Sequence, residues 1–238
     1  MTDPQMITVL GYQSDPWLSS MIGKAAFTVR LTANDVSGKP RGPYFACVRV
    51  ATADIPSVLQ VQREGFYLVD TNVRFEVLRD EFRSNKRINR CNVRTASTDD
   101  QEDIGRLAGS AFRFSRFHLD PGFQKEVADT IKAEWARNFF RGLRGKHLLV
   151  AETEGHVVGF LLLLNPSPGD YVIDLVGVAS EYRGRGIGQT LLSSLWNHLS
   201  DCNRVIVGTQ VANTDSLRLY EKLGFRITRS EYIFHGHF

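Results

Sequence analysis

Two arginines and three glycines fall within six consecutive residues, 183–188, in the order Arg-Gly-Arg-Gly-Ile-Gly. Residues 171–179 before them are mostly apolar and β-branched, which predicts a buried strand, and residues 189–199 place leucines on one helical face. Glycine lets the backbone approach a ligand closely, and a helix start offers unpaired N–H groups and a positive dipole end. The segment therefore predicts a strand, a turn and a helix that together bind phosphate oxygens.

The glycine spacing excludes two common nucleotide-binding motifs. The Walker motif ends in Gly-Lys-Ser/Thr, which is missing here, and the dinucleotide fingerprint needs another glycine spacing and an acidic residue at the end of the next strand. What fits is Arg-x-x-Gly-x-Gly, which resembles the acyl-CoA loop of the GCN5-related N-acetyltransferases (GNAT). The resemblance implies that acetyl-CoA is the co-substrate. The loop residues that would hold it are Arg183, Gly184, Arg185, Gly186, Ile187 and Gly188.

The composition excludes several other classes of protein. The chain has 238 residues, 42% hydrophobic and 23% charged, as expected for one large or two modest globular domains. A net charge of +3 is too small to indicate a nucleic-acid partner, and the apolar run at 157–164 is too short to span a membrane. Three widely spaced cysteines (Cys47, Cys91 and Cys202) favour neither a disulfide framework nor a metal site. We expect a cytoplasmic protein without a bound metal.

The order of predicted elements from residue 92 onward is β-α-α-β-β-β-α-β-α-β. The strands are expected at 92–96, 147–153, 156–164, 171–179, 204–209 and 226–234, and the helices near 98–112, 123–141, 189–199 and 216–223. This is the element order of the GNAT fold. The resemblance implies an α/β (α+β) fold with a mixed, mostly antiparallel sheet flanked by helices. Residues 91–238 are predicted to form the complete acetyltransferase domain.

Residues 1–90 carry a second, shorter pattern. A strand is predicted at 44–50, a helix at 55–64, a Gly65-Phe66 turn and a strand at 67–78. Helix, Gly-Phe and strand recur at 216–234, so we predict a partial internal repeat, with chance as the alternative. Residues 1–90 would then be a smaller, partial GNAT-like domain, joined by a polar linker at 79–92. Val61 stands where the second copy has Tyr220.

The resemblance also implies where acetyl-CoA lies. In the family it enters where two parallel strands part, here 171–179 and 204–209, and pairs with backbone groups of the first strand. The backbone groups concerned are those of Val176, Gly177 and Val178, and the Val176 N–H would stabilise the oxyanion. Asn213 precedes a helix and is equally suited to capping it or to contacting CoA.

Tyr220 is the candidate general acid. It lies in Leu-Tyr-Glu-Lys-Leu-Gly-Phe, residues 219–225, which resembles the closing Leu-Tyr-x-x-x-Gly-Phe motif of the family. The resemblance implies that its hydroxyl protonates the leaving thiolate, and the alternative from periodicity alone is a core aromatic. No general base is assigned. Asp174, Glu152, His118 and Asp120 are all candidates, and water is an alternative.

Residues 112–139 suggest the acceptor. This segment, rich in arginine and aromatic residues, resembles the acceptor region of the TDP-fucosamine acetyltransferases. The resemblance implies a TDP-linked amino-dideoxy sugar as acceptor and a role in cell-surface polysaccharide biosynthesis. Arg113, Arg116 and His118 would bind the diphosphate, with an ordinary surface loop as the alternative.

Two other functions stay open from the sequence. One is acetylation of a peptide, protein or other small-molecule amine, and the other is a degenerate, non-enzymatic domain that binds CoA for regulation. The sequence also leaves open whether the protein is a homodimer.

Overall fold

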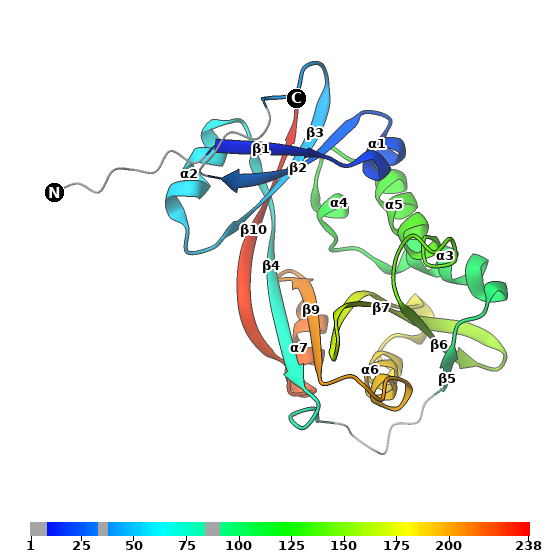
Figure 1. The fold of residues 1–238 in the computed structure, drawn as a ribbon. Helices are drawn as coiled ribbons and strands as arrows, with labels where there is room; N and C mark the ends of the chain where they lie inside the picture. Colours follow the sequence, from blue (N-terminus) through cyan, green and yellow to red (C-terminus); the bar gives the residue numbers. More distant parts are fainter. Residues whose placement is uncertain (1–8, 33–37, 84–90) are drawn as a thin grey trace.

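The computed structural model describes residues 9–32, 38–83 and 91–238, which form a single mixed sheet with helices on both faces (Figure 1). In these residues the sheet order is β1-β2-β3-β10-β4-β9-β8-β7-β6-β5. The strands are β1 (Val9–Ser14), β2 (Ala25–Thr32), β3 (Tyr44–Ala51), β4 (Tyr67–Leu78), β5 (Asn92–Thr95), β6 (His147–Thr153), β7 (His156–Ser167), β8 (Asp170–Val178), β9 (Arg204–Gln210) and β10 (Arg226–His237). The helices are α1 (Pro16–Ile22), α2 (Ile55–Arg63), α3 (Gln101–Ala111), α4 (Arg116–Leu119), α5 (Lys125–Arg137), α6 (Ile187–His198) and α7 (Thr214–Lys222).

The structure confirms the element order predicted from residue 92 onward, and with it the fold class. Two neighbouring pairs, β2–β3 and β8–β9, are parallel, and the other pairs are antiparallel. The segment β1-α1-β2 was not predicted, and α4 adds a short turn of helix between α3 and α5. The predicted linker at 79–92 lies partly outside the described residues, so the domain boundary at residue 90 stays a prediction.

The predicted repeat is present in detail. Gly65 and Gly224 both adopt a positive φ, 89° and 91°. The Phe66 N–H donates to the carbonyl of Val61, and the Phe225 N–H donates to that of Tyr220, at 3.1 and 3.0 Å. The helices that precede the turns, α2 and α7, are each nine residues long and begin at side-chain caps, Asp54 and Asn213. The two copies therefore share one local geometry.

The repeats exchange their last strands. β4, which closes the first copy, pairs with β9 of the second, and β10 pairs with β3 of the first. β4 and β10 also pair with each other at the centre of the sheet (Figure 1). Because each half supplies a strand to the other, both halves share one continuous sheet. The first half lacks room for a glycine loop and a counterpart of α6, since residues 33–43 are fewer than the twelve residues of α6 alone.

The two faces of the sheet carry different helices. Valines of β9 and Phe75 of β4 pack with α6 and α7 in the largest apolar cluster. On the opposite face α3 packs over β6, β7 and β8, and α1, α4 and α5 pack over β3 and β10. We call this opposite side the α5 face. Among the described residues, no helix is long and apolar enough to cross a membrane.

A buried carboxylate connects the two halves on the α5 face. Asp120, which follows α4, is 1% exposed. It accepts hydrogen bonds from Tyr67 Oη at 2.5 Å, His235 Nδ1 at 2.6 Å and His237 Nε2 at 2.9 Å. Burial opposes ionisation, but the hydrogen bonds from His235, His237 and Tyr67 outweigh it and hold the pKa of Asp120 well below its usual range. The carboxylate thus ties the α4 segment to β4 and β10.

We expect Asp120→Ala to lower the free energy of unfolding by about 3–5 kcal/mol, because it removes the acceptor of the buried His235 ring and of the Tyr67 hydroxyl. Urea unfolding at pH 7 measures the loss. In the wild type this stabilisation is present above the unfolded carboxyl pKa of about 4 and is lost as the pH falls toward the lower folded value. Asp103→Ala is the control, since Asp103 pairs with Arg106 on an exposed helix face. A loss below about 1 kcal/mol for Asp120→Ala would contradict this role.

Candidate active site

The parallel strands β8 and β9 part along their length. Their register runs from Asp170–Arg204 to Ile173–Val207, whereas β8 continues to Val178 and β9 to Gln210. The open end therefore includes Val176, Gly177 and Val178, as the sequence predicted. Gly177 also has a packing role, because a Cβ there would lie 2.7 Å from the Phe160 ring.

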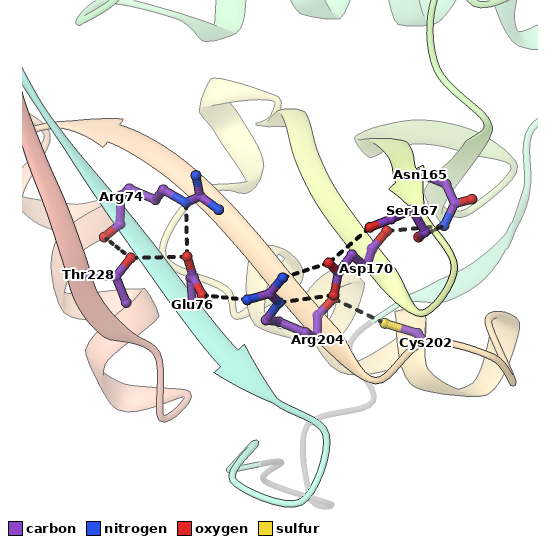
Figure 2. A network of polar contacts seen from close by, with 8 residues as sticks. All are labelled: Arg74, Glu76, Asn165, Ser167, Asp170, Cys202, Arg204 and Thr228. Carbon is purple, nitrogen blue, oxygen red and sulfur yellow. Dashed lines mark hydrogen bonds and ion pairs between the residues drawn. The ribbon is translucent and has the colours of Figure 1, made fainter.

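An ion network holds the other end of this strand pair closed. Arg204 on β9 donates to both carboxylate oxygens of Asp170 on β8, at 3.0 and 2.6 Å, and also reaches Glu76 on β4 at 3.3 Å. Figure 2 shows the network continuing from Glu76 to Arg74 and Thr228, and from Asp170 to Ser167. These bonds hold β8 and β9 together at the end opposite to the opening.

A β-bulge in β8 marks the start of the open end. Leu162 and Leu163 on β7 face Leu175 and Ile173, so Asp174 is the extra residue. The bulge turns Leu175 toward the apolar residues packed under α3, while Ile173 packs on the other face, in the apolar cluster under α6 and α7. The Asp174 carboxylate accepts two hydrogen bonds from Arg144, both 2.6 Å, and one from Trp135 Nε1 at 2.9 Å. The bulge therefore separates the part of β8 that pairs with β9 from the part that is free to contact a ligand.

The glycine loop and the start of α6 form a pocket. Gly184 and Gly186 adopt positive φ values of 72° and 82°, and Gly186 is the N-cap of α6. The first turn of α6 carries no acidic residue and no side-chain cap, so its N–H groups face outward unneutralised. The pocket has a volume of about 590 Å³, and its lining residues are Thr153, Tyr182, Gly184, Arg185, Gly186, Ile187, Gln189 and Lys222.

The chemistry of this pocket suits phosphate groups. Arg185 and Lys222 supply two cations, and the Arg185 guanidinium lies 5.1 Å from the centre of the Tyr182 ring. The buried Thr153 hydroxyl, beside the pocket, has no hydrogen-bond partner among the described residues. Sequence reasoning missed Thr153, Gln189 and Lys222, which lie far apart in the chain. Gly188 packs beside Leu219 of α7.

Arg183 bonds to the protein itself. Its Nε donates to the carbonyl of Val178 at 3.1 Å and its Nη2 to that of Ala111 at 2.6 Å. These bonds fasten the glycine loop to β8 and to the end of α3. A direct contact between Arg183 and CoA stays a prediction.

Tyr220 and Asn213 both lie on α7. Tyr220 is 2% exposed, with its ring between those of Phe75 and Phe225 at centroid distances of 5.6 and 5.4 Å. Burial raises the pKa of the Tyr220 phenol well above its usual value, so the hydroxyl stays protonated at neutral pH. Asn213 caps α7 by accepting from the Ser216 N–H at 3.4 Å. The capping role is present, and the catalytic and CoA-binding roles stay predictions.

The three predicted acceptor residues have different surroundings. Arg113 is exposed in the loop after α3. Arg116 donates to Cys47 Sγ at 2.7 Å and lies over the Phe117 ring. Both ring nitrogens of His118 are engaged, with Ser115 at 2.6 Å and with Asp129 at 2.9 Å. His118 therefore presents no free ring nitrogen in this structure, and the acceptor assignment stays a prediction.

The candidate bases are likewise engaged. Glu152 binds Arg94, and Asp174 and Asp120 hold the contacts described above. Asp70 on β4, which the sequence did not single out, differs from them: it is 7% exposed, and its Oδ2 has no hydrogen-bond partner among the described residues. Burial raises its pKa to about 6, against hydrogen bonds from Thr71 and from Gln210 at the open end of β9. Asp70 thus changes protonation near neutral pH.

Comparison with known proteins agrees with this geometry. Residues 113–225 match the acetyltransferase (GNAT) family. The spore coat polysaccharide biosynthesis protein SpsD of Bacillus subtilis is 28% identical over 95% of this chain and 83% of its own. The dTDP-fucosamine acetyltransferase of Escherichia coli is 23% identical over 91% of this chain and 93% of its own.

A solved structure shows the same fold. A GCN5-related N-acetyltransferase from Sphaerobacter thermophilus superposes with a TM-score of 0.61 at 16% identity, covering 90% of this chain and 72% of its own. Among the described residues, no group of three side chains is arranged to hold a metal ion. Parted parallel strands, a glycine loop at a helix start and the family match over residues 113–225 together show that the chain contains an acetyltransferase domain of the GNAT family.

Proposed function

We propose that the protein transfers an acetyl group from acetyl-CoA to the amino group of a nucleotide-linked amino sugar, with a TDP-linked amino-dideoxy sugar as the acceptor class. The parting of β8 and β9 beside the phosphate-binding pocket supports the donor. Similarity along almost the whole chain to a dTDP-fucosamine acetyltransferase and to a polysaccharide biosynthesis protein supports the acceptor.

The residues of this chain have separate roles in the proposed reaction. The α6 N-terminus, the Gly184–Gly186 backbone, Arg185 and Lys222 bind the CoA phosphates. The open part of β8 offers its backbone to the pantetheine arm, and the Val176 N–H faces the thioester oxygen. Acetyl-CoA supplies the acetyl group as a thioester.

The covalent step is a direct attack of the acceptor amine on the thioester. The acceptor nitrogen bonds to the thioester carbon as the carbon–sulfur bond breaks. Tyr220 donates its proton to the leaving sulfur, and the amine proton passes to water or to a nearby carboxylate. The buried, protonated state of Tyr220 suits the first of these proton transfers.

The test is thiol release from acetyl-CoA with a panel of TDP- and UDP-linked amino sugars, peptide amines and free amino acids. We expect turnover with a TDP-amino sugar to exceed that with the peptide and amino-acid amines by at least about 100-fold, since sites that bind an acceptor's polar groups discriminate strongly against compounds that lack them. Preference for a peptide amine would show that the acceptor is not an amino sugar, while acetyl transfer from acetyl-CoA would still hold. CoA binding without turnover on any amine would indicate a non-enzymatic CoA-binding domain.

A further inference from the structure

Lys132 is a buried cation without an anionic partner. It lies on α5, is 9% exposed, and its Nζ is 4.9 Å from the centre of the Phe112 ring and 4.6 Å from that of Trp135. No carboxylate of the described residues lies within ion-pair distance of it. Four other charges of α5 are paired, Lys125 with Asp129 and Arg137 with Glu134. Keeping a charge out of water without a counter-ion is unfavourable, so Lys132 needs an explanation.

Two further cations lie around Lys132. Arg144 is 4.4 Å from the centre of the same Trp135 ring. Arg116 is near enough for its charge to act on Lys132. Asp174, whose two oxygens are bound by Arg144, is the carboxylate whose charge acts on this group. Three cations against one carboxylate leave an excess of positive charge around the buried Lys132.

Lys132 keeps most of its charge at neutral pH. Burial, followed by the charge of Arg116, lowers the pKa of Lys132 to about 8, and Asp174 acts in the opposite direction while Arg144 adds to the lowering. At pH 7 the amine is therefore mainly the ammonium form. A bound anion would compensate the charge that the protein leaves uncompensated.

The position of the cluster separates it from the CoA pocket. Lys132, Arg116 and Asp174 lie on the α5 face of the sheet, and Asp174 is the bulge residue two positions before Val176. The glycine loop and α6 cover the other face, where the CoA phosphates would bind. An anion at Lys132 therefore approaches the open end of β8 from the side opposite to CoA.

We propose that Lys132, flanked by Arg116 and Arg144, binds the diphosphate of the acceptor and so directs the acceptor's amine toward the open end of β8. This rests on the proposed function for the identity of the reaction, and the binding of a diphosphate can be measured without any reaction. In this proposal Lys132, Arg116 and Arg144 supply the positive charge that binds the diphosphate. They take the place of Arg113, which is exposed, and of His118, which already has two partners.

The test compares Lys132→Met with the wild type by calorimetric titration of TDP and of inorganic pyrophosphate. Coenzyme A is present in excess, so that its own pocket is filled. We expect the variant to bind both probes at least about tenfold more weakly, because a charge-assisted hydrogen bond is lost. Lys125→Met, which removes an exposed lysine from the same helix, should bind them like the wild type.

A melting curve on the same variant separates this role from a structural one. Removing an unpaired buried charge should leave the melting temperature unchanged or raise it. A lowered melting temperature with unchanged affinity would make Lys132 a structural cation held by two rings and would overturn the proposal. So would a wild type that binds neither probe. If the variant loses diphosphate binding while no sugar amine is acetylated, the anion site stands and the acceptor named above fails.

Discussion

Gly186→Val is expected to reduce the affinity for coenzyme A by at least about 100-fold. Gly186 is the N-cap of α6 and has φ 82°, so its backbone forms the floor of the pocket that the first-turn N–H groups face. A branched side chain there would stand where phosphate oxygens must approach. Loss of two charge-assisted hydrogen bonds, about 1.5–3 kcal/mol each, accounts for the size of the effect. Calorimetry with coenzyme A measures it.

Backbone strain must be separated from loss of the site, because valine is disfavoured at positive φ. Gly142→Val provides the control: Gly142 has φ 70°, open space around its Cα, and lies in the loop after α5, away from the pocket. It should show similar destabilisation and normal affinity. A folded Gly186→Val protein with unchanged affinity would remove the CoA assignment from this loop.

The second half of the fold could be predicted because its signals are local. The apolar run before residue 183, the leucine spacing of α6 and the Gly-Phe turn each depend on residues close together in sequence. The repeat was predictable for the same reason. Gly65 and Gly224 each need a left-handed backbone, which marks the turn in both copies.

The strand exchange could not be predicted, because pairing partners of β4 and β10 are far apart in the chain. The mixed apolar and polar residues of β4 give no sign that this strand will lie at the centre of the sheet. β1 and β2 were missed because they pair with each other near one edge and carry few buried residues.

The site residues show the same difference between local sequence signals and contacts made only by the fold. The glycine loop and Tyr220 belong to short motifs, and the structure places the loop at the start of α6 and Tyr220 on α7. Lys132 and Asp70 belong to no motif, and Lys222 occupies a variable position of one. They are noticed only when the fold shows that Lys132 is a buried cation, that Asp70 has an unpaired buried oxygen and that Lys222 lines a pocket. Conversely, His118 belongs to an arginine-rich and aromatic segment, yet the fold occupies both of its ring nitrogens.

Tyr220→Phe is expected to lower kcat by about 10²-fold, the lower end of the 10²–10⁴ range for general acids. The phenol must be protonated to act, and burial ensures this by raising its pKa. The same shift makes complete transfer to a thiolate, whose pKa is roughly 8.5, less favourable. The hydroxyl therefore begins as a hydrogen-bond donor to the sulfur and transfers its proton only as charge develops there. Since that charge is absent in the ground state, the affinity for acetyl-CoA should hardly change.

Steady-state kinetics and a melting curve on purified Tyr220→Phe decide between a catalytic and a core role. The ring stays between Phe75 and Phe225, so the melting temperature should be nearly that of the wild type. Tyr171→Phe is the matched control, because it removes a hydroxyl that donates to Asp201 at the closed end of β8. That control should lose about 1 kcal/mol of stability and keep its kcat. In the wild type, kcat should show no fall from Tyr220 ionisation below pH 10, because the raised pKa keeps the phenol protonated there. Normal turnover in Tyr220→Phe would show that Tyr220 has only a packing role. Another group would then have to protonate the thiolate.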